Sequence, residues 1–118
     1  MKMAVEMLDD GIKKIDLSGR MDIEGTSQVE TKLALASAVE KSFVVVDLSQ
    51  VDYMASIGIG VLVNTAKFIK IRNGKMVFLN PQPNVALVLT KTGIDAVIPI
   101  YNNFEDAKKA LLEAQQHS

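Results

Sequence analysis

Ser56 is the residue of this sequence whose position best suits covalent modification. It directly precedes a long apolar segment with helical periodicity, and serine is a preferred residue at the N-cap of a helix. The first N–H groups of a helix lack internal partners, and the helix dipole adds partial positive charge at that end. Both effects would stabilise a phosphate on Ser56. Ser56 is therefore either a simple N-cap, which is the more common role, or also a phosphorylation site.

Two glycines, Gly58 and Gly60, follow Ser56 in the first turns of the same predicted helix. Inside a helix each glycine costs about 1 kcal/mol relative to alanine, so both need a physical reason. Close packing of the helix on a sheet is one explanation, and close approach of a partner to the helix backbone is the other. The sequence leaves both explanations open.

The helix that contains these glycines has two apolar faces. At about 100° per residue, one broad stripe is assigned to the core and contains Ile59, Leu62, Val63, Ala66 and Ile69. A second, nearly opposite stripe, which we term the apolar ridge, contains Ile57, Val61, Phe68 and Ile71, with the polar Asn64 in its middle. Such a face is covered by another helix, forms a dimer contact or binds a partner, and we expect partner binding and exposure in the monomer.

Several residue types that common catalytic sites need are missing. The chain has no cysteine, no tryptophan and one histidine, His117, close to the end of the sequence. Thiolate catalysis, cysteine-ligated zinc and multi-histidine metal sites are thus excluded, and a Ser-His-Asp triad would have to use the C-terminal tail. We therefore expect no enzymatic activity, no catalytic residue, no metal and no cofactor.

Charged residues are nearly balanced, with 13 basic and 14 acidic side chains and a formal net charge of −1. This balance excludes a strongly basic nucleic-acid-binding protein and a polybasic membrane patch. Asp-Asp-Gly at 9–11 is interpreted as a hairpin turn rather than as an acidic metal site. A local basic group is interpreted as the solvated end of a helix; it consists of Lys67, Lys70, Arg72 and Lys75.

The length of 118 residues fits one domain spanning residues 1–118. No apolar run approaches the roughly 20 residues that a membrane span needs. Glu6 interrupts the N-terminal segment where a signal peptide would be apolar. We expect a cytoplasmic protein without membrane contact that is a monomer or a weak dimer.

Hydrophobic periodicity, capping residues and glycine or proline breaks divide the chain into nine predicted elements. In chain order they are strands at 3–8 and 12–17, a helix from 27 to about 41, a strand at 43–46, a helix at 56–72, a strand at 75–79, a helix at 84–91, a strand at 97–100 and a helix from 103 to about 115. The order β-β-α-β-α-β-α-β-α predicts a single α/β domain with a mixed, mostly parallel sheet of about five strands and about four helices.

Specific local patterns decide several of these boundaries. Ser27 and Glu30 have the spacing of a capping box, so the first helix is expected to begin at Ser27. The apolar, β-branched run at 43–46 predicts a strand buried on both faces. Loops are expected at 18–22 and, after the strand ends at 47–49, as far as about 55. The predicted buried stripe of the first helix is Val29, Leu33, Ala36 and Val39.

Residues 44–62, VVVDLSQVDYMASIGIGVL, resemble the signature of STAS domains, in particular those of bacterial anti-sigma factor antagonists. Two weaker matches support the resemblance, SGRMD at 18–22 and LTKTGI at 89–94. The resemblance covers nearly the whole chain, with the elements in the same order. It implies the STAS fold for this sequence.

The resemblance also implies a partner-switching mechanism. The unphosphorylated antagonist binds a serine kinase of the GHKL type that doubles as an anti-sigma factor, and this binding releases a sigma factor. The kinase then phosphorylates a serine that matches Ser56, which abolishes binding, and a PP2C-type phosphatase resets the antagonist. Asp22 matches the acidic residue of the family in the loop beside that serine.

This sequence departs from the family motif on both sides of the serine. Ala55 stands in place of an aspartate, and Ile57 in place of a serine or threonine, which lengthens the apolar ridge. The alternative hypothesis is a STAS-like module without a switch, which acts as an interaction or scaffold subunit of a larger complex such as a transporter accessory assembly. The residues expected to contact the partner are Asp22, Ser56, Ile57, Gly58, Gly60, Val61, Asn64 and Phe68.

Overall fold

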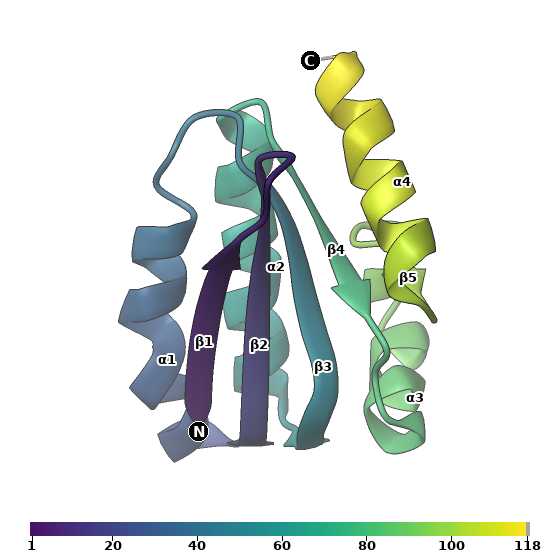
Figure 1. The fold of residues 1–118 in the computed structure, drawn as a ribbon. Coiled ribbons are helices and arrows are strands. Elements are labelled where there is room, and N and C mark those ends of the chain that lie inside the picture. Colours follow the sequence, from purple (N-terminus) through teal and green to yellow (C-terminus); the bar gives the residue numbers. More distant parts are fainter. Residues whose placement is uncertain (118) are drawn as a thin grey trace.

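The computed structural model describes residues 1–117, which form a five-stranded sheet with helices on both faces (Figure 1). The strands are β1 (Lys2–Met7), β2 (Ile12–Met21), β3 (Phe43–Met54), β4 (Lys75–Leu79) and β5 (Ile100–Tyr101). The helices are α1 (Ile23–Ala36), α2 (Ser56–Ile71), α3 (Pro83–Lys91), a short 3-10 helix η1 (Ile94–Ala96) and α4 (Phe104–Gln116). The strand order is β1-β2-β3-β4-β5, with β1 antiparallel to β2 and the other neighbours parallel. The predicted α/β class, mixed sheet and order of elements are confirmed.

β2 and β3 are both longer than the sequence predicted. They pair in parallel as far as Met21 and Met54, so most of 18–22 and 50–55 is strand rather than loop. The register shifts twice along this pairing, and β3 carries the extra residues. The buried residues of the extension are therefore three apart instead of two, which hides the strand pattern in the sequence; they are Leu48, Val51 and Met54.

α1 begins and ends earlier than predicted. Its N-cap is Asp22, whose Oδ1 accepts a hydrogen bond of 2.8 Å from the N–H of Gly25, and Ser27 lies inside the helix. The prediction that a capping box at Ser27 starts this helix is therefore wrong. The helix stops at Ala36, so Val39 lies beyond it and is exposed rather than buried. Asp22 rather than Ser27 caps α1 because Gly25 fits closely against β2. A Cβ at Gly25 would lie 1.9 Å from the carbonyl oxygen of Arg20.

The C-terminal strand is also displaced from its predicted place at 97–100. Gly93, with a φ of +75°, ends α3 and leads into η1, and β5 is limited to Ile100–Tyr101. The last helix is as predicted at its start, because the Oδ1 of Asn103 accepts a hydrogen bond from the N–H of Asp106 at 2.9 Å. Because β5 is short, the edge of β4 that faces away from β3 is paired only at Phe78 and Leu79.

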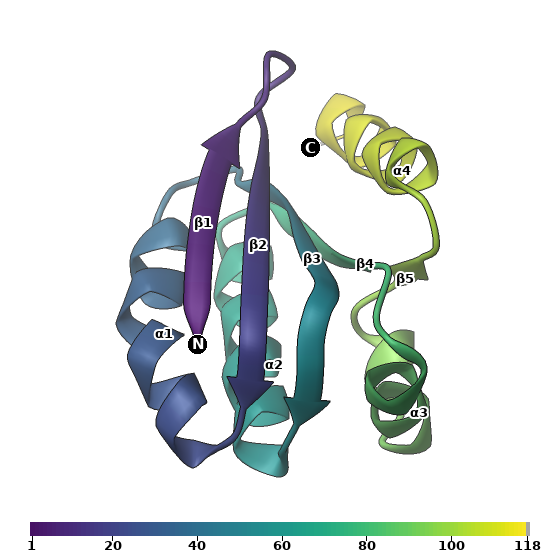
Figure 2. The same cartoon turned by 60° about the horizontal axis from the view of Figure 1, so that its bottom comes forward.

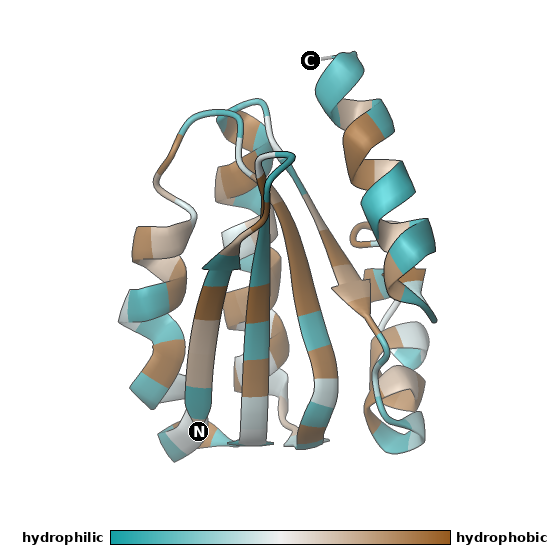
Figure 3. Cartoon of the chain, in the orientation of Figure 1, coloured by the Kyte–Doolittle hydropathy of each residue, from teal (hydrophilic) through white to brown (hydrophobic). Residues whose placement is uncertain are grey.

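The helices cover both faces of the sheet (Figures 1 and 2), and two apolar layers hold them there. One layer joins α1, α2 and α3 to one face of the sheet, and the other joins α4 to the opposite face. Because β3 lies between these layers, Val44, Val45 and Val46 are all fully buried, which confirms burial on both faces. Figure 3 shows that apolar and polar bands alternate along α4, as expected for a helix with one face on the sheet.

Within residues 1–117, no helix combines the length and the apolar character that crossing a membrane requires.

Phe78 and Phe68 form a matched pair for testing the core. Phe78 of β4 is fully buried, whereas Phe68 of α2 is 52% exposed. We expect Phe78→Ala to lower the free energy of unfolding by about 3–5 kcal/mol, because it leaves a cavity in the core. Phe68→Ala should lower it by less than about 1 kcal/mol. Urea denaturation of both variants measures the difference, and equal losses would place Phe68 in the core instead.

Candidate functional site

The starts of α1 and α2 lie together at one end of the sheet. Met21 ends β2 and Met54 ends β3, and these two residues pair, which places Asp22 and Ala55 next to each other. The N–H of Ala55 donates a hydrogen bond to the carbonyl oxygen of Met21 at 3.0 Å and fixes this arrangement. Asp22 and Ser56, which are far apart in the sequence, are thereby brought to the same end of the sheet.

Ser56 is the first residue of α2 rather than its N-cap. Ala55 occupies the cap position with an extended backbone and offers no side-chain acceptor, so the predicted capping role of Ser56 is wrong. Within the described residues the exposed hydroxyl of Ser56 has no hydrogen-bond partner. The N–H groups of Gly58 and Ile59 bond to the carbonyl oxygen of Ala55, so the first turn is already formed. No residue of α2 in this turn is acidic, so the helix itself supplies no charge against the positive end of its dipole.

Asp22 is held in its charged form. The N–H of Gly25 donates to its carboxylate, and the guanidinium of Arg20 lies 3.6 Å away. The hydrogen bond from Gly25, and then the charge of Arg20, lower the pKa of the Asp22 carboxyl below its ordinary value. Asp22 is therefore an N-cap of α1 and a fixed negative charge beside the start of α2, and it is unsuited to act as a general base at neutral pH.

Sequence reasoning missed Arg20 and Tyr53, which belong to the same end of the sheet. They are register partners on β2 and β3, and the Arg20 guanidinium stacks over the Tyr53 ring at 4.4 Å from its centroid. Both side chains are exposed. Arg20 and Tyr53 become neighbours only because β2 and β3 extend this far. The sequence predicted loops in both segments, so it gave no sign of this contact. The two side chains add a cationic and aromatic patch next to Asp22.

The apolar ridge on α2 is largely exposed, as expected. Ile57 is 44% exposed, Phe68 52% and Ile71 75%. Val61 is the exception, because it is partly buried and packs against the core cluster. The polar Asn64 in the middle of the ridge is exposed. No other helix in the described part of the chain covers this face, so the apolar ridge is open to a partner.

The site residues form a strip rather than a point. Asp22, Ser56, Ile57, Gly58 and Gly60 lie at or near the start of α2, whereas Phe68 lies 12 residues further along. At about 1.5 Å per residue, this separation is about 18 Å along the helix axis. A partner that contacts both ends would therefore cover most of one face of α2.

A profile of the STAS domain matches residues 7–107 of the chain. The chain belongs to the STAS domain family. One relative, BtrV of Bordetella bronchiseptica, is provisionally named an anti-sigma factor antagonist and is 29% identical over 114 residues, which cover 97% of each chain. The crystal structure of an anti-sigma factor antagonist from Mycobacterium paratuberculosis matches with a TM-score of 0.84 and 25% identity, over 93% of this chain and 92% of that chain.

The same fold occurs in SpoIIAA, an anti-sigma factor antagonist and cell fate determinant of Bacillus. Its unphosphorylated form matches with a TM-score of 0.74 and 21% identity, over 92% of this chain and 96% of that chain. Its phosphorylated form matches with a TM-score of 0.68 and 20% identity, over 92% and 99%. The resemblance to STAS domains that residues 44–62 indicated is confirmed.

The two glycines of the STAS motif have different structural reasons. Gly58 is buried, and a Cβ there would lie 2.7 Å from Cγ and 3.1 Å from the carbonyl oxygen of Met21. Close packing of α2 on the end of β2 explains this glycine. Gly60 is exposed, and a Cβ there would meet no atom within 4 Å. Internal packing gives no reason for Gly60, and close approach of a partner to that position stays a prediction.

Alanine substitutions separate these two reasons. We expect Gly58→Ala to lower the free energy of unfolding by about 1–3 kcal/mol, because Met21 is fully buried and has little room to move. Gly60→Ala should raise it by up to about 1 kcal/mol, because alanine is the better helix former. Thermal or urea denaturation of this STAS domain measures both values. A loss of stability in Gly60→Ala would contradict the open surroundings of that residue.

Proposed function

We propose that this protein is a cytoplasmic anti-sigma factor antagonist that works by partner switching. In its unphosphorylated form it binds an anti-sigma factor that is also a GHKL-type serine kinase, and a sigma factor is released. Phosphorylation of Ser56 abolishes this binding, and a PP2C-type phosphatase restores it. One observation carries the proposal: the exposed hydroxyl of Ser56, which has no hydrogen-bond partner among residues 1–117, lies at the start of α2, beside the exposed apolar ridge.

The relatives support the same class of function. BtrV and the Mycobacterium paratuberculosis protein are named as anti-sigma factor antagonists, and they match nearly the full length of this chain. SpoIIAA shares the fold and has structures in unphosphorylated and phosphorylated forms. A STAS fold therefore exists that accommodates a phosphate without losing its architecture.

Phosphorylation at this position acts through local charge rather than through refolding. A phosphoserine carries a charge of about −1.5 to −2 at neutral pH. The start of α2 stabilises that charge with its N–H groups and dipole, so the helix needs no rearrangement. The partner, however, must then desolvate a dianion next to the apolar ridge, which disfavours binding.

In the transfer step this chain supplies only the acceptor. The Ser56 oxygen forms a bond to the γ-phosphorus of ATP, the bond from that phosphorus to ADP breaks, and the hydroxyl proton passes to a base. Asp22 is a poor base because its carboxylate is stabilised by Gly25 and Arg20. Ala55 offers no carboxylate next to the serine. The base therefore belongs to the kinase.

Phosphorylation of Ser56 is tested directly with candidate GHKL-type kinases and ATP. We expect wild type to gain one phosphate, and Ser56→Ala to gain none, as measured by intact mass and peptide mapping. Ser27→Ala is the matched control, because Ser27 is also exposed but lies inside α1, and it should be modified like wild type. Full modification of Ser56→Ala by the same kinase would refute the assignment.

The role of the apolar ridge is tested by partner affinity. We expect Phe68→Ala to weaken binding to the kinase by about 1–3 kcal/mol, since large exposed aromatic side chains often anchor interfaces. Leu87→Ala on α3 is the control, because Leu87 is also 52% exposed but lies outside the ridge. Titration calorimetry measures both affinities. Equal affinities of the two variants for the kinase would show that the apolar ridge lies outside the interface. Equal affinities of the phosphorylated and unphosphorylated wild-type protein would favour the alternative of a scaffold module without a switch.

A further inference from the structure

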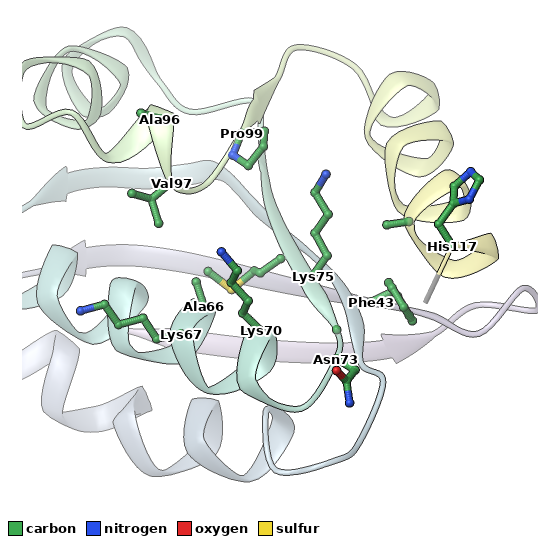
Figure 4. Close-up of a pocket in the computed structure, with 13 residues that line it drawn as sticks. Phe43, Ala66, Lys67, Lys70, Asn73, Lys75, Ala96, Val97, Pro99 and His117 are labelled. Atoms are coloured by element: carbon green, nitrogen blue, oxygen red, sulfur yellow. The ribbon is translucent and has the colours of Figure 1, made fainter.

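A groove of about 690 Å³ lies at the edge of β4, far from Ser56 (Figure 4). It opens between the C-terminal half of α2 on one face of the sheet, the end of α4 on the other face, and the segment that follows η1. The residues that matter for its chemistry are Lys67, Lys70, Lys75, Met76, Pro99 and His117.

The floor of the groove is a free strand edge. β5 pairs only with Phe78 and Leu79, so the first half of β4 has no neighbour on that side. The N–H of Lys75 donates toward β3, to the carbonyl oxygen of Ser42, whereas the N–H of Phe78 donates to the carbonyl oxygen of Pro99 on the β5 side. Backbone groups alternate in direction along a strand, so the N–H and C=O of Met76 point to the β5 side, into the groove.

The groove is basic and partly apolar. Lys67, Lys70 and Lys75 make no ion pair with any described residue, and no described lining residue is acidic. Figure 4 shows Lys70 and Lys75 directed into the space between α2, β4 and Pro99. Apolar side chains complete the walls; they include Ala66, Val97 and Pro99. The sequence alone suggested only a solvated helix end for these lysines.

We propose that this groove binds an extended acidic segment of a partner protein, which adds to the sheet as a short strand along the free edge of β4. The backbone of the segment hydrogen-bonds to Met76, its carboxylates contact the lysines, and its apolar side chains contact the groove walls. The free part of β4, residues 75–77, spans about 10 Å, enough for about three residues. A compact anion such as phosphate would use the lysines but would leave the strand edge and the apolar walls unused.

This second surface is independent of the proposed phosphorylation site. Ser56 and Lys70 lie 14 residues apart on α2, which is about 21 Å along the helix axis. Ser56 is therefore accessible while the groove is occupied, although the far end of the apolar ridge, at Phe68, adjoins Lys67 in the sequence. The groove thus allows a partner to remain attached while Ser56 is modified. Failure of either assignment leaves the other intact.

The test uses the full chain, labelled with ¹⁵N, and a blocked hexapeptide of alternating glutamate and valine as the probe. We expect saturable shifts of the Met76 amide and its neighbours, and weaker binding at raised salt. Lys70→Glu combined with Lys75→Glu should lower the affinity by about tenfold or more. Lys32→Glu combined with Lys91→Glu is the charge-matched control, because both lysines are exposed on other helices, and it should bind like wild type.

Two N-methylated peptides test strand addition on the wild-type protein, so the result does not depend on how any variant folds. In a strand the N–H groups of alternate residues point to opposite edges. Methylating the valine nitrogens blocks one edge, and methylating the glutamate nitrogens blocks the other. We expect one of these peptides to lose binding and the other to keep it.

Four outcomes would overturn the proposal. The hexapeptide fails to bind, the two N-methylated peptides behave alike, or the control variant loses as much affinity as the groove variant. The fourth is that inorganic phosphate shifts the same amides at lower concentration than the peptide, which would indicate a simple anion site instead.

Discussion

The parallel pairing of β2 with β3, carried through to Met21 and Met54, is the constraint on which the site depends. It makes the two strands end at the same level, and the hydrogen bond from Ala55 to Met21 locks the last residues together. α1 and α2 must then start side by side. The buried Met21 side chain also sets how closely α2 lies on the sheet, because it packs directly under Gly58. The position of Ser56 is a consequence of this contact rather than of the helix alone.

The parts of the fold with local signals were predictable from the sequence. The run at 43–46 is apolar at every position because it is buried between two helical layers, and the cap at Asn103 uses neighbouring residues only. The extensions of β2 and β3 were not predictable, because extra residues in β3 break the two-residue alternation. The choice between Asp22 and Ser27 as the cap of α1 also depends on a non-local fit, that of Gly25 against Arg20.

The features of the candidate site also separate into those with a local signal in the sequence and those that depend on residues distant in the chain. The helical period alone gave the exposed positions of the apolar ridge, apart from Val61, whose burial depends on neighbouring elements. Gly58 and Gly60 are indistinguishable in the sequence, since their difference arises from Met21, which is distant in the chain. The stack of Arg20 on Tyr53 needed the register between two strands. Exposure that follows from the period of one helix was predictable from the sequence, whereas side-chain contacts that follow from strand pairing were not.

The absence of a side-chain acceptor at Ala55 leaves α2 without the kind of cap that α1 and α4 possess. Such a cap contributes about 1 kcal/mol to stability. Phosphate oxygens on Ser56 would accept from those N–H groups of the same turn that do not bond to Ala55, so the modification would supply the missing acceptor. Folding and phosphorylation are then thermodynamically linked, because the folded helix stabilises the phosphate more than the unfolded chain does. Under the proposed switch, the phosphorylated protein would unfold less often and resist proteolysis longer, so the form that no longer binds the partner would also be the more durable one.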